Sequence, residues 1–146
     1  MTLAALLKPH VESAVADKLY QTKPLNTPDK VAEVHLGFLP PKRETVEQGE
    51  DYPFVLIRLL GGPDSYQSRG FTILLYGGLY AKEIADGLVD IEDLADRLLS
   101  LRESRELDPY SACEGRVHYG DKQGNQPLPY FECFVEIEFT KEPRPR

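Results

Sequence analysis

Three carboxylates near the end of the sequence are the strongest candidates for acid–base chemistry. Glu132, Glu136 and Glu138 all fall on even positions of one segment. In a strand, even positions share one face, with i and i+2 neighbours about 7 Å apart. Paired carboxylates of this kind can act as acid and base in hydrolysis. Acidic residues on strands usually face water, so the pattern favours a solvated sheet face over a catalytic pair.

Histidine and cysteine side chains are the other groups with potential chemistry. His10, His35 and His118 belong to different segments, and none has a second ligand at the spacing of a helical zinc motif. Cys113 and Cys133 lie on strands that a hairpin would make neighbours, so they could approach each other or pair with a histidine as nucleophile and base. Small buried core residues are the favoured interpretation of both cysteines.

The glycine pairs do not form a phosphate loop. Gly61–Gly62 and Gly77–Gly78 lack the lysine and serine or threonine that open the helix of such a loop. We therefore predict no catalytic, cofactor-binding or metal-binding residue, no cofactor, and no enzymatic activity. The alternative from another functional class is a small acid–base enzyme that uses Glu132, Glu136 or His118. A monomeric binding module is a third alternative.

Tyrosine usage indicates contact surfaces. The chain has eight tyrosines and no tryptophan. Tyrosine is common in interfaces because it buries a large area at a small cost in side-chain entropy. Core and rim aromatics are an equally good interpretation. Most of these tyrosines fall at expected strand ends and loops, namely Tyr52, Tyr66, Tyr76, Tyr80, Tyr110, Tyr119 and Tyr130.

Two expected strands are more apolar than a small one-sided sheet needs. Leu56, Leu60, Leu74 and Phe134 are expected on faces that one domain leaves open. An exposed apolar patch usually indicates a partner. The candidate interface residues are Arg43, Tyr66, Arg69, Tyr76, Tyr80 and Phe134.

Apolar spacing predicts helices at 2–21 and 88–104, and strands at 31–39, 54–60, 71–76, 113–119 and 130–140. Pro9 requires either a helix that begins there or a kink, and Asp90 is the expected N-cap of the second helix. The strand at 130–140 alternates apolar and polar residues, which is typical of a sheet with one wet face. The expected fold class is α+β, with one mainly antiparallel sheet of about four to five strands and two helices packed on one face.

Length and charge limit the functional classes. One domain over 1–146 is the default for 146 residues, with a mobile loop at 40–51 and a loose tail at 141–146. The net charge of −7 argues against general nucleic-acid binding and against adsorption to an anionic membrane. The start of the chain lacks the basic region of a signal peptide, and two cysteines give no disulfide framework, so the expected compartment is the reducing cytoplasm.

Three segments of the second half of the chain share a distinctive pattern. Tyr52–Gly61 is an apolar strand that opens with proline and phenylalanine and contains one arginine. The segment 71–80 runs through glycine to a tyrosine and precedes an amphipathic helix around Ile91. Residues 127–131 open a further strand, which ends in a short proline and arginine segment. With these segments the sequence resembles the tail-terminator and tail-completion-like (minor tail) proteins of tailed phages and prophages, which have a "PFV-I-R-L-G" strand and a "P-x-P-Y-aromatic" strand start. The likeness covers about residues 50–146.

The resemblance implies a structural role without cofactor or catalytic residues. Its members assemble as rings, commonly hexameric, on the last ring of the tail tube, and the chain is expected to be able to remain a monomer before assembly. The implied partners are other copies of the chain, the major tail tube protein and the head–tail connector, with no membrane and no sequence-specific nucleic acid. The implied location is the virion tail, and the host cytoplasm during assembly. A head–tail connector or another minor tail protein is the closest alternative.

Overall fold

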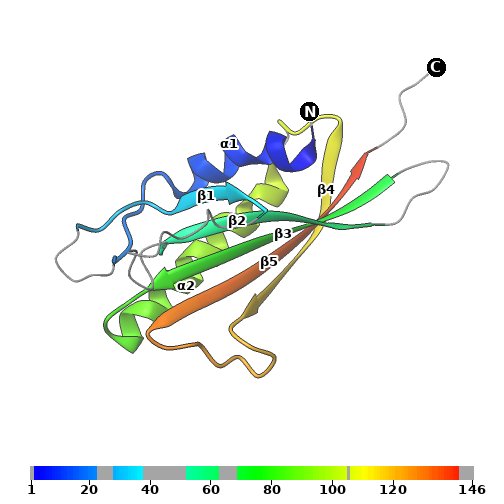
Figure 1. Ribbon diagram of the computed structural model, residues 1–146. Helices are drawn as coiled ribbons and strands as arrows, with labels where there is room; N and C mark the ends of the chain where they lie inside the picture. The colour runs from blue at the N-terminus through cyan, green and yellow to red at the C-terminus, as the bar shows by residue number, and fades with distance from the viewer. Residues whose placement is uncertain (1, 23–27, 38–51, 63–68, 105, 142–146) are drawn as a thin grey trace, which may run out of the picture.

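The computed structural model describes residues 2–22, 28–37, 52–62, 69–104 and 106–141. The predictions for the loop at 40–51 and for residues 142–146 of the tail fall outside these ranges, as do the interface candidates Arg43 and Tyr66. Figure 1 shows two helices and one long sheet. The elements are α1 (Leu3–Val15), β1 (Glu33–Leu36), β2 (Phe54–Gly61), β3 (Arg69–Tyr80), α2 (Ile84–Leu99), the 3₁₀ turn η1 (Ser100–Glu103), β4 (Tyr110–Tyr119) and β5 (Tyr130–Lys141).

The sheet has five strands in the order β1-β2-β3-β5-β4. Every neighbouring pair is antiparallel except β1 and β2, which run parallel. The predicted α+β class with a mainly antiparallel sheet is therefore confirmed. The pairing of β3 with β5 is the longest, and its register runs unbroken from Arg69 opposite Lys141 to Tyr80 opposite Tyr130.

Helix α1 begins with a capping residue and passes through a proline. The Thr2 hydroxyl accepts a hydrogen bond from the Ala5 backbone N–H at 3.2 Å, which satisfies one of the free donors of the first turn. Pro9 lies inside the helix, so neither a start at Pro9 nor a helix reaching residue 21 is correct. The helix ends at Val15. Leu19, inside the predicted helix at 2–21, lies beyond its end and is 59% exposed.

Helix α2 begins at Ile84, four residues before the predicted start at residue 88. Glu83 occupies the N-cap position, whereas Asp90 lies inside the helix. The apolar pattern failed here because Ile84 and Leu88 are exposed and so do not mark the buried face. From Ile91 onward, α2 follows the predicted pattern, and the exposed acidic residues lie on its other side.

Both helices contribute to one core with alternate residues of the strands. Leu7 and Val11 of α1 and Leu94 and Leu98 of α2 join the strand residues in this cluster. The strand residues of the cluster are Val34, Val55, Ile57, Ile73, Leu75, Leu79, Phe131, Cys133, Val135, Ile137 and Phe139. In Figure 1, β3 and β5 cross in front of α2. The clean alternation of β5 is thus explained, because its odd positions are buried in this core.

Strand β3 is twelve residues long, twice the predicted 71–76, because it starts at Arg69 and continues through Gly77 and Gly78 to Tyr80. A Cβ on Gly77 would lie 2.7 Å from Leu94 Cδ2, and a Cβ on Gly78 would lie 2.4 Å from Phe54 Cε1. Neighbouring side chains therefore fill the space above both glycines. The glycine pair therefore marks a close approach in the sheet.

The remaining strand ends differ by a few residues from the predictions. Strand β1 covers only Glu33–Leu36 of the predicted 31–39. Strand β4 begins at Tyr110, three residues earlier than predicted, and β5 extends to Lys141. Lys141 therefore belongs to the sheet and not to a tail.

Polar contacts hold the end of α1 against α2. The Arg97 guanidinium donates to Asp93 Oδ2 at 2.8 Å, to the Ala14 carbonyl at 3.1 Å, and to Asp17. The Tyr20 hydroxyl donates to the same Asp93 oxygen at 3.1 Å. The hydrogen bond from Arg97 lowers the pKa of Asp17 below its ordinary value. One guanidinium therefore connects two helices that are far apart in sequence, in the multidentate geometry that arginine favours.

Candidate interaction surface

The face of the sheet opposite the core is the first candidate surface, and we call it the distal face. It consists of the strand residues that alternate with the core residues. The register aligns Leu56, Tyr76, Phe134 and His118 in one row across four strands. The distal face carries Leu56 and Arg58 on β2, Leu74 and Tyr76 on β3, and the acidic residues Glu132, Glu136 and Glu138 on β5.

Aromatic rings form a continuous row on the distal face. The ring centroids are 4.9 Å apart for Tyr52 and Phe54, 5.3 Å for Phe54 and Tyr76, and 4.7 Å for Tyr76 and Phe134. Tyr130 stacks on Tyr52 at 4.6 Å. These spacings lie in the range in which aromatic pairs attract each other. Phe54 is 1% exposed, so only the half-buried rings on either side of it, such as Tyr76 and Phe134, can contact a partner.

Tyr76 lies at the centre of this row and is held by a carboxylate. Its hydroxyl donates to Glu132 Oε1 at 2.6 Å. Burial, followed by this hydrogen bond, raises the pKa of Tyr76 above its ordinary value. Glu132 therefore fixes the orientation of an aromatic ring.

Replacing Tyr76 by phenylalanine is expected to make folding less sensitive to alkaline pH. Because the folded chain raises the pKa of Tyr76 above 10.0, the unfolded chain binds fewer protons above about pH 10, and stability falls as pH rises. The Tyr76→Phe protein lacks this titration. Near neutral pH, its free energy of unfolding should be about 1 kcal/mol below that of the native chain, because the hydrogen bond to Glu132 is missing. Between about pH 9 and 11, however, its free energy of unfolding should fall less steeply with pH than that of the native chain. Urea unfolding across this range measures the difference, and parallel losses would contradict the prediction.

The three residues of the enzyme alternative share the distal face but have separate partners. Glu132 binds Tyr76, and a His118 ring nitrogen lies 2.6 Å from the Asp121 carbonyl. Glu136 is opposite Arg116 in the register. Within the described ranges, no hydrogen bond or ion pair joins the three. The sheet therefore brings these groups to one face without converging them on a common point.

The two cysteines lie on neighbouring strands but not opposite each other. Cys133 pairs with Tyr119, whereas Cys113 lies at an irregularity in β4, with its sulfur 3.8 Å from the Thr140 hydroxyl. Cys133 is buried, and burial raises the pKa of its thiol to about 12. A thiol with such a pKa is a poor nucleophile near neutral pH. Burial of Cys133 matches the predicted core role, whereas Cys113 is exposed and does not.

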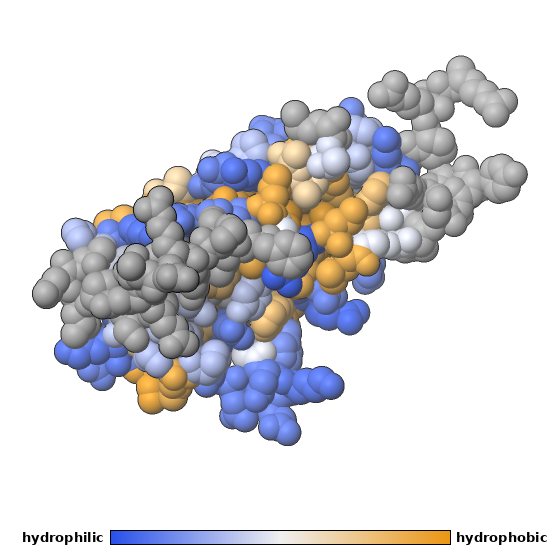
Figure 2. All heavy atoms as spheres, in the orientation of Figure 1, coloured by the Kyte–Doolittle hydropathy of each residue, from blue (hydrophilic) through white to orange (hydrophobic). Residues whose placement is uncertain are grey.

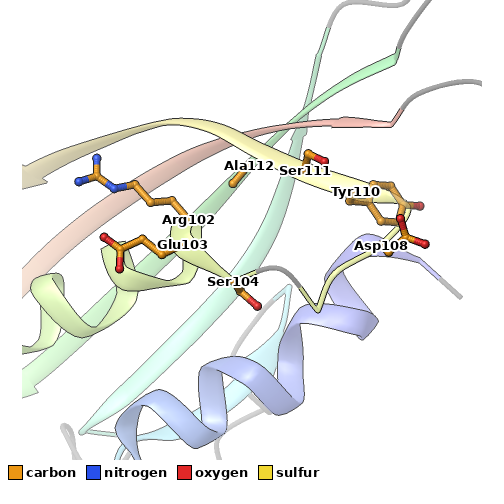
Figure 3. Close-up of a pocket in the computed structure, with 7 residues that line it drawn as sticks. All are labelled: Arg102, Glu103, Ser104, Asp108, Tyr110, Ser111 and Ala112. Atoms are coloured by element: carbon orange, nitrogen blue, oxygen red, sulfur yellow. The ribbon is translucent and has the colours of Figure 1, made fainter.

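An open polar pocket of about 450 Å³ lies between η1 and the start of β4. Figure 3 shows that Arg102 and Glu103 extend at one end of this pocket, and that Asp108 and Tyr110 lie at the other end. The labelled side chains do not converge on one point. Ligand sites usually combine an apolar lining with a few converging polar groups, and this pocket lacks that arrangement.

The described interface candidates occupy different environments. Tyr76 and Phe134 are half-buried members of the aromatic row, whereas Tyr80 is only 8% exposed. Arg69 is the first residue of β3 and pairs with Lys141. Of the apolar residues expected on an open face, Leu60 is 53% exposed but Leu56 is buried.

A second set of exposed apolar side chains escaped prediction. Ile84, Leu88 and Val89 lie at the start of α2 and are all exposed. Leu19 and Val89 line the same shallow depression. An earlier predicted start of α2 would have revealed the set, because apolar residues would then appear beside acidic ones on the outer side of the helix.

Comparison with known proteins adds no assignment. The chain matches no known family model and no curated protein in sequence. Within the described ranges, no three acidic, histidine or cysteine side chains are placed to hold a metal ion. None of the described helices is long and apolar enough to cross a membrane.

Proposed function

We propose that this chain is a structural subunit of a phage or prophage tail. In this role it forms a ring, as a tail terminator or completion protein, and caps the tail tube at the head–tail junction. Its partners are other copies of itself, the major tail tube protein and the head–tail connector. The proposal starts from the resemblance of residues 50–146 to that family.

The observation that supports it most is the amount of apolar side chain left on the surface. Leu59 and Leu60 of β2 and Val89 of α2 are each more than half exposed. Single exposed leucines are common, but two successive leucines with half of their surface exposed, as at the end of β2, favour a protein contact. The aromatic row adds half-buried tyrosine and phenylalanine rings, which are typical of the centres of interfaces.

Removal of the gene from the phage or prophage tests the proposal. A terminator stops growth of the tail tube and offers a surface to the head. Without it, we expect tails of uncontrolled length and heads that remain unattached, as seen by negative-stain electron microscopy. Complementation with the native gene should restore virions. Complementation with Glu92→Ala, an exposed change on α2, should do so equally well.

Two other outcomes are informative. Tails of normal length beside unattached heads would favour a connector over a terminator. Normal infectious virions in the absence of the gene would refute a structural role in the tail. Antibody labelling of native virions should mark the head–tail junction if the proposal is correct.

A further inference from the structure

Strand β1 lies at one border of the sheet, where it pairs with β2 on one side only. The Glu33 N–H donates to the Pro53 carbonyl at 3.2 Å, and the Gly37 N–H donates to the Ile57 carbonyl at 2.8 Å. Because the two strands run parallel, the residues that bond to β2 alternate along β1. The odd-numbered residues of β1 therefore turn their backbone groups toward β2.

The backbone groups of Val34 and Leu36 face the opposite way, toward the free edge of β1. Within the described part of the chain, neither residue forms a hydrogen bond at this edge. Each offers one N–H donor and one C=O acceptor. An edge of this kind is a template for the addition of another strand.

A groove of about 510 Å³ lies at this free edge, between α1 and β1. Its volume is within the range of ligand sites in proteins. Figure 1 shows α1 alongside β1 at the border of the sheet, and in Figure 2 hydrophobic and hydrophilic residues lie close together along this border. The residues that line the groove are Lys8, Glu12, Val15 and Ala16 of α1, and Val31, Ala32, Glu33, Val34 and His35.

The apolar residues of the groove lie on both of its sides. Val15 of α1 is 1% exposed, and Ala32 and Val34 on the other side are also buried. Val31 is 37% exposed, so part of its side chain is free to contact a ligand. An apolar side chain that enters the groove would lose contact with water, which favours binding.

The charged residues of the groove balance each other. On α1, Lys8 and Glu12 have opposite charges. On the other side, Glu33 accepts from Lys30 Nζ at 3.3 Å, and its second carboxylate oxygen lies 3.4 Å from His35 Nε2. A ligand that matches this groove in charge is therefore neutral.

The opposite border of the sheet lacks these properties. Strand β4 carries the exposed charged or polar residues Glu114, Arg116 and His118, and its register shifts between Ala112 and Glu114. Charged side chains and bulges are the features that prevent strand addition at sheet borders. Strand β1 is therefore the border that accepts a further strand.

We propose that the groove binds an extended, uncharged peptide segment of another protein, which adds a sixth strand to the sheet beside β1. Its main chain pairs with Val34 and Leu36, and its alternate apolar side chains enter the groove beside Val31. This is peptide recognition by strand addition, in which the main chain supplies affinity and a pocket supplies specificity. The inference goes beyond the tail role and does not depend on it.

A single peptide segment suits this groove better than a second copy of the chain. A copy that paired through its own β1 would bring its own α1 to the same border, and the two helices would compete for the space of the groove. The described β1 has only four residues, so few hydrogen bonds can form. We therefore expect a dissociation constant in the micromolar range, as is typical of small, transient contacts.

A library of random dodecapeptides displayed on filamentous phage, selected on the immobilised full chain, supplies the probe. The tightest binder is synthesised with blocked ends, and its dissociation constant is measured by fluorescence anisotropy. Its sequence should show apolar residues at alternate positions. Because the groove is neutral, binding should change little between low and high salt.

Two substitutions with matched controls test where the peptide binds. Leu36→Pro removes one outward N–H and should raise the dissociation constant at least about tenfold, whereas Leu36→Thr keeps this N–H and should bind like the native chain. Proline is tolerated at such a border position. Val31→Glu places a carboxylate in the groove and should weaken binding equally. Leu60→Glu, the same change at an exposed leucine outside the groove, should not. Circular dichroism checks that each variant is folded.

The backbone pattern gives the sharper readout. N-methylation of the peptide at one residue at a time should weaken binding at alternate residues only, because the residues between them face away from β1. In the complex, amide hydrogen exchange measured by NMR should slow at Val34 and Leu36. It should change little at Glu33, whose N–H is already bonded to β2.

Several results would overturn the inference. One is a library that yields no binder, and another is a binder whose affinity Leu36→Pro and Val31→Glu leave unchanged. Loss of binding on N-methylation at every position would exclude strand addition. Self-association of the native chain that Leu36→Pro abolishes would assign the edge to a second copy instead. None of these results bears on the tail role, which the gene deletion tests separately.

Discussion

The Phe131→Ala protein is expected to lose about 3–5 kcal/mol of its free energy of unfolding. Phe131 is fully buried in the shared core, where β5 meets the start of α2. Its ring lies directly against Gly87 of α2. Truncation would remove the burial of a large ring and leave a cavity that the sheet and helix cannot easily close. Urea unfolding followed by circular dichroism measures the loss.

The same change three residues later provides a matched control. Phe134 is on the distal face of the same strand and is only half-buried. Phe134→Ala should therefore cost less, about 1–2 kcal/mol, mainly through its ring contact with Tyr76. Equal losses for the two proteins would show that the core does not lie on the Phe131 side of the sheet.

The second large effect is expected from adding one methyl group at Gly87. A Cβ there would lie 2.1 Å from Phe131 Cε2 and 2.2 Å from Cζ, which is far inside van der Waals contact. Alanine is the better helix former by about 1 kcal/mol, but the clash must move a buried ring or the helix itself. We expect Gly87→Ala to lower stability by about 2 kcal/mol. Glu92→Ala on the exposed side of α2 should stay within about 0.5 kcal/mol of the native chain.

A double-mutant cycle separates the clash from other effects. In a Phe131→Leu background the ring is absent, and the smaller side chain can adjust. Gly87→Ala should then be close to neutral, or stabilising through helix propensity. The same loss in both backgrounds would mean that contact with Phe131 is not the reason for glycine at this position.

The strands with strong local patterns were predictable from the sequence. Alternation fixed the buried side of β5, and the apolar run at 54–60 identified β2. The sequence predicted neither the start of α2 nor the continuation of β3 through Gly77 and Gly78. Glycine normally weakens a strand, and only the neighbouring Leu94 and Phe54 side chains explain its presence there. Such contacts between distant segments leave no local periodicity.

The surface was predictable only in part. Tyrosine usage and the apolar residue Phe134 indicated the distal face, on which Tyr76 and Phe134 do meet. Neither the links of the aromatic row through Tyr52 and Phe54 nor the burial of Tyr80 could be predicted, because both depend on strand order. That order places β5 between β3 and β4, although β4 directly precedes β5 in the chain.

The position of β5 also affects when the chain can become native. This strand follows every other described element in the sequence, yet it lies inside the sheet and pairs with neighbours on both sides. During synthesis, the ribosome releases the N-terminal segments first. Strands β3 and β4 therefore emerge before β5, the strand that pairs with both of them. A nascent polypeptide halted before residue 130 would lack that joining strand. The sheet can therefore close only once residues 130–141 have left the ribosome, and the aromatic row, which includes Phe134 of this strand, forms at the same moment.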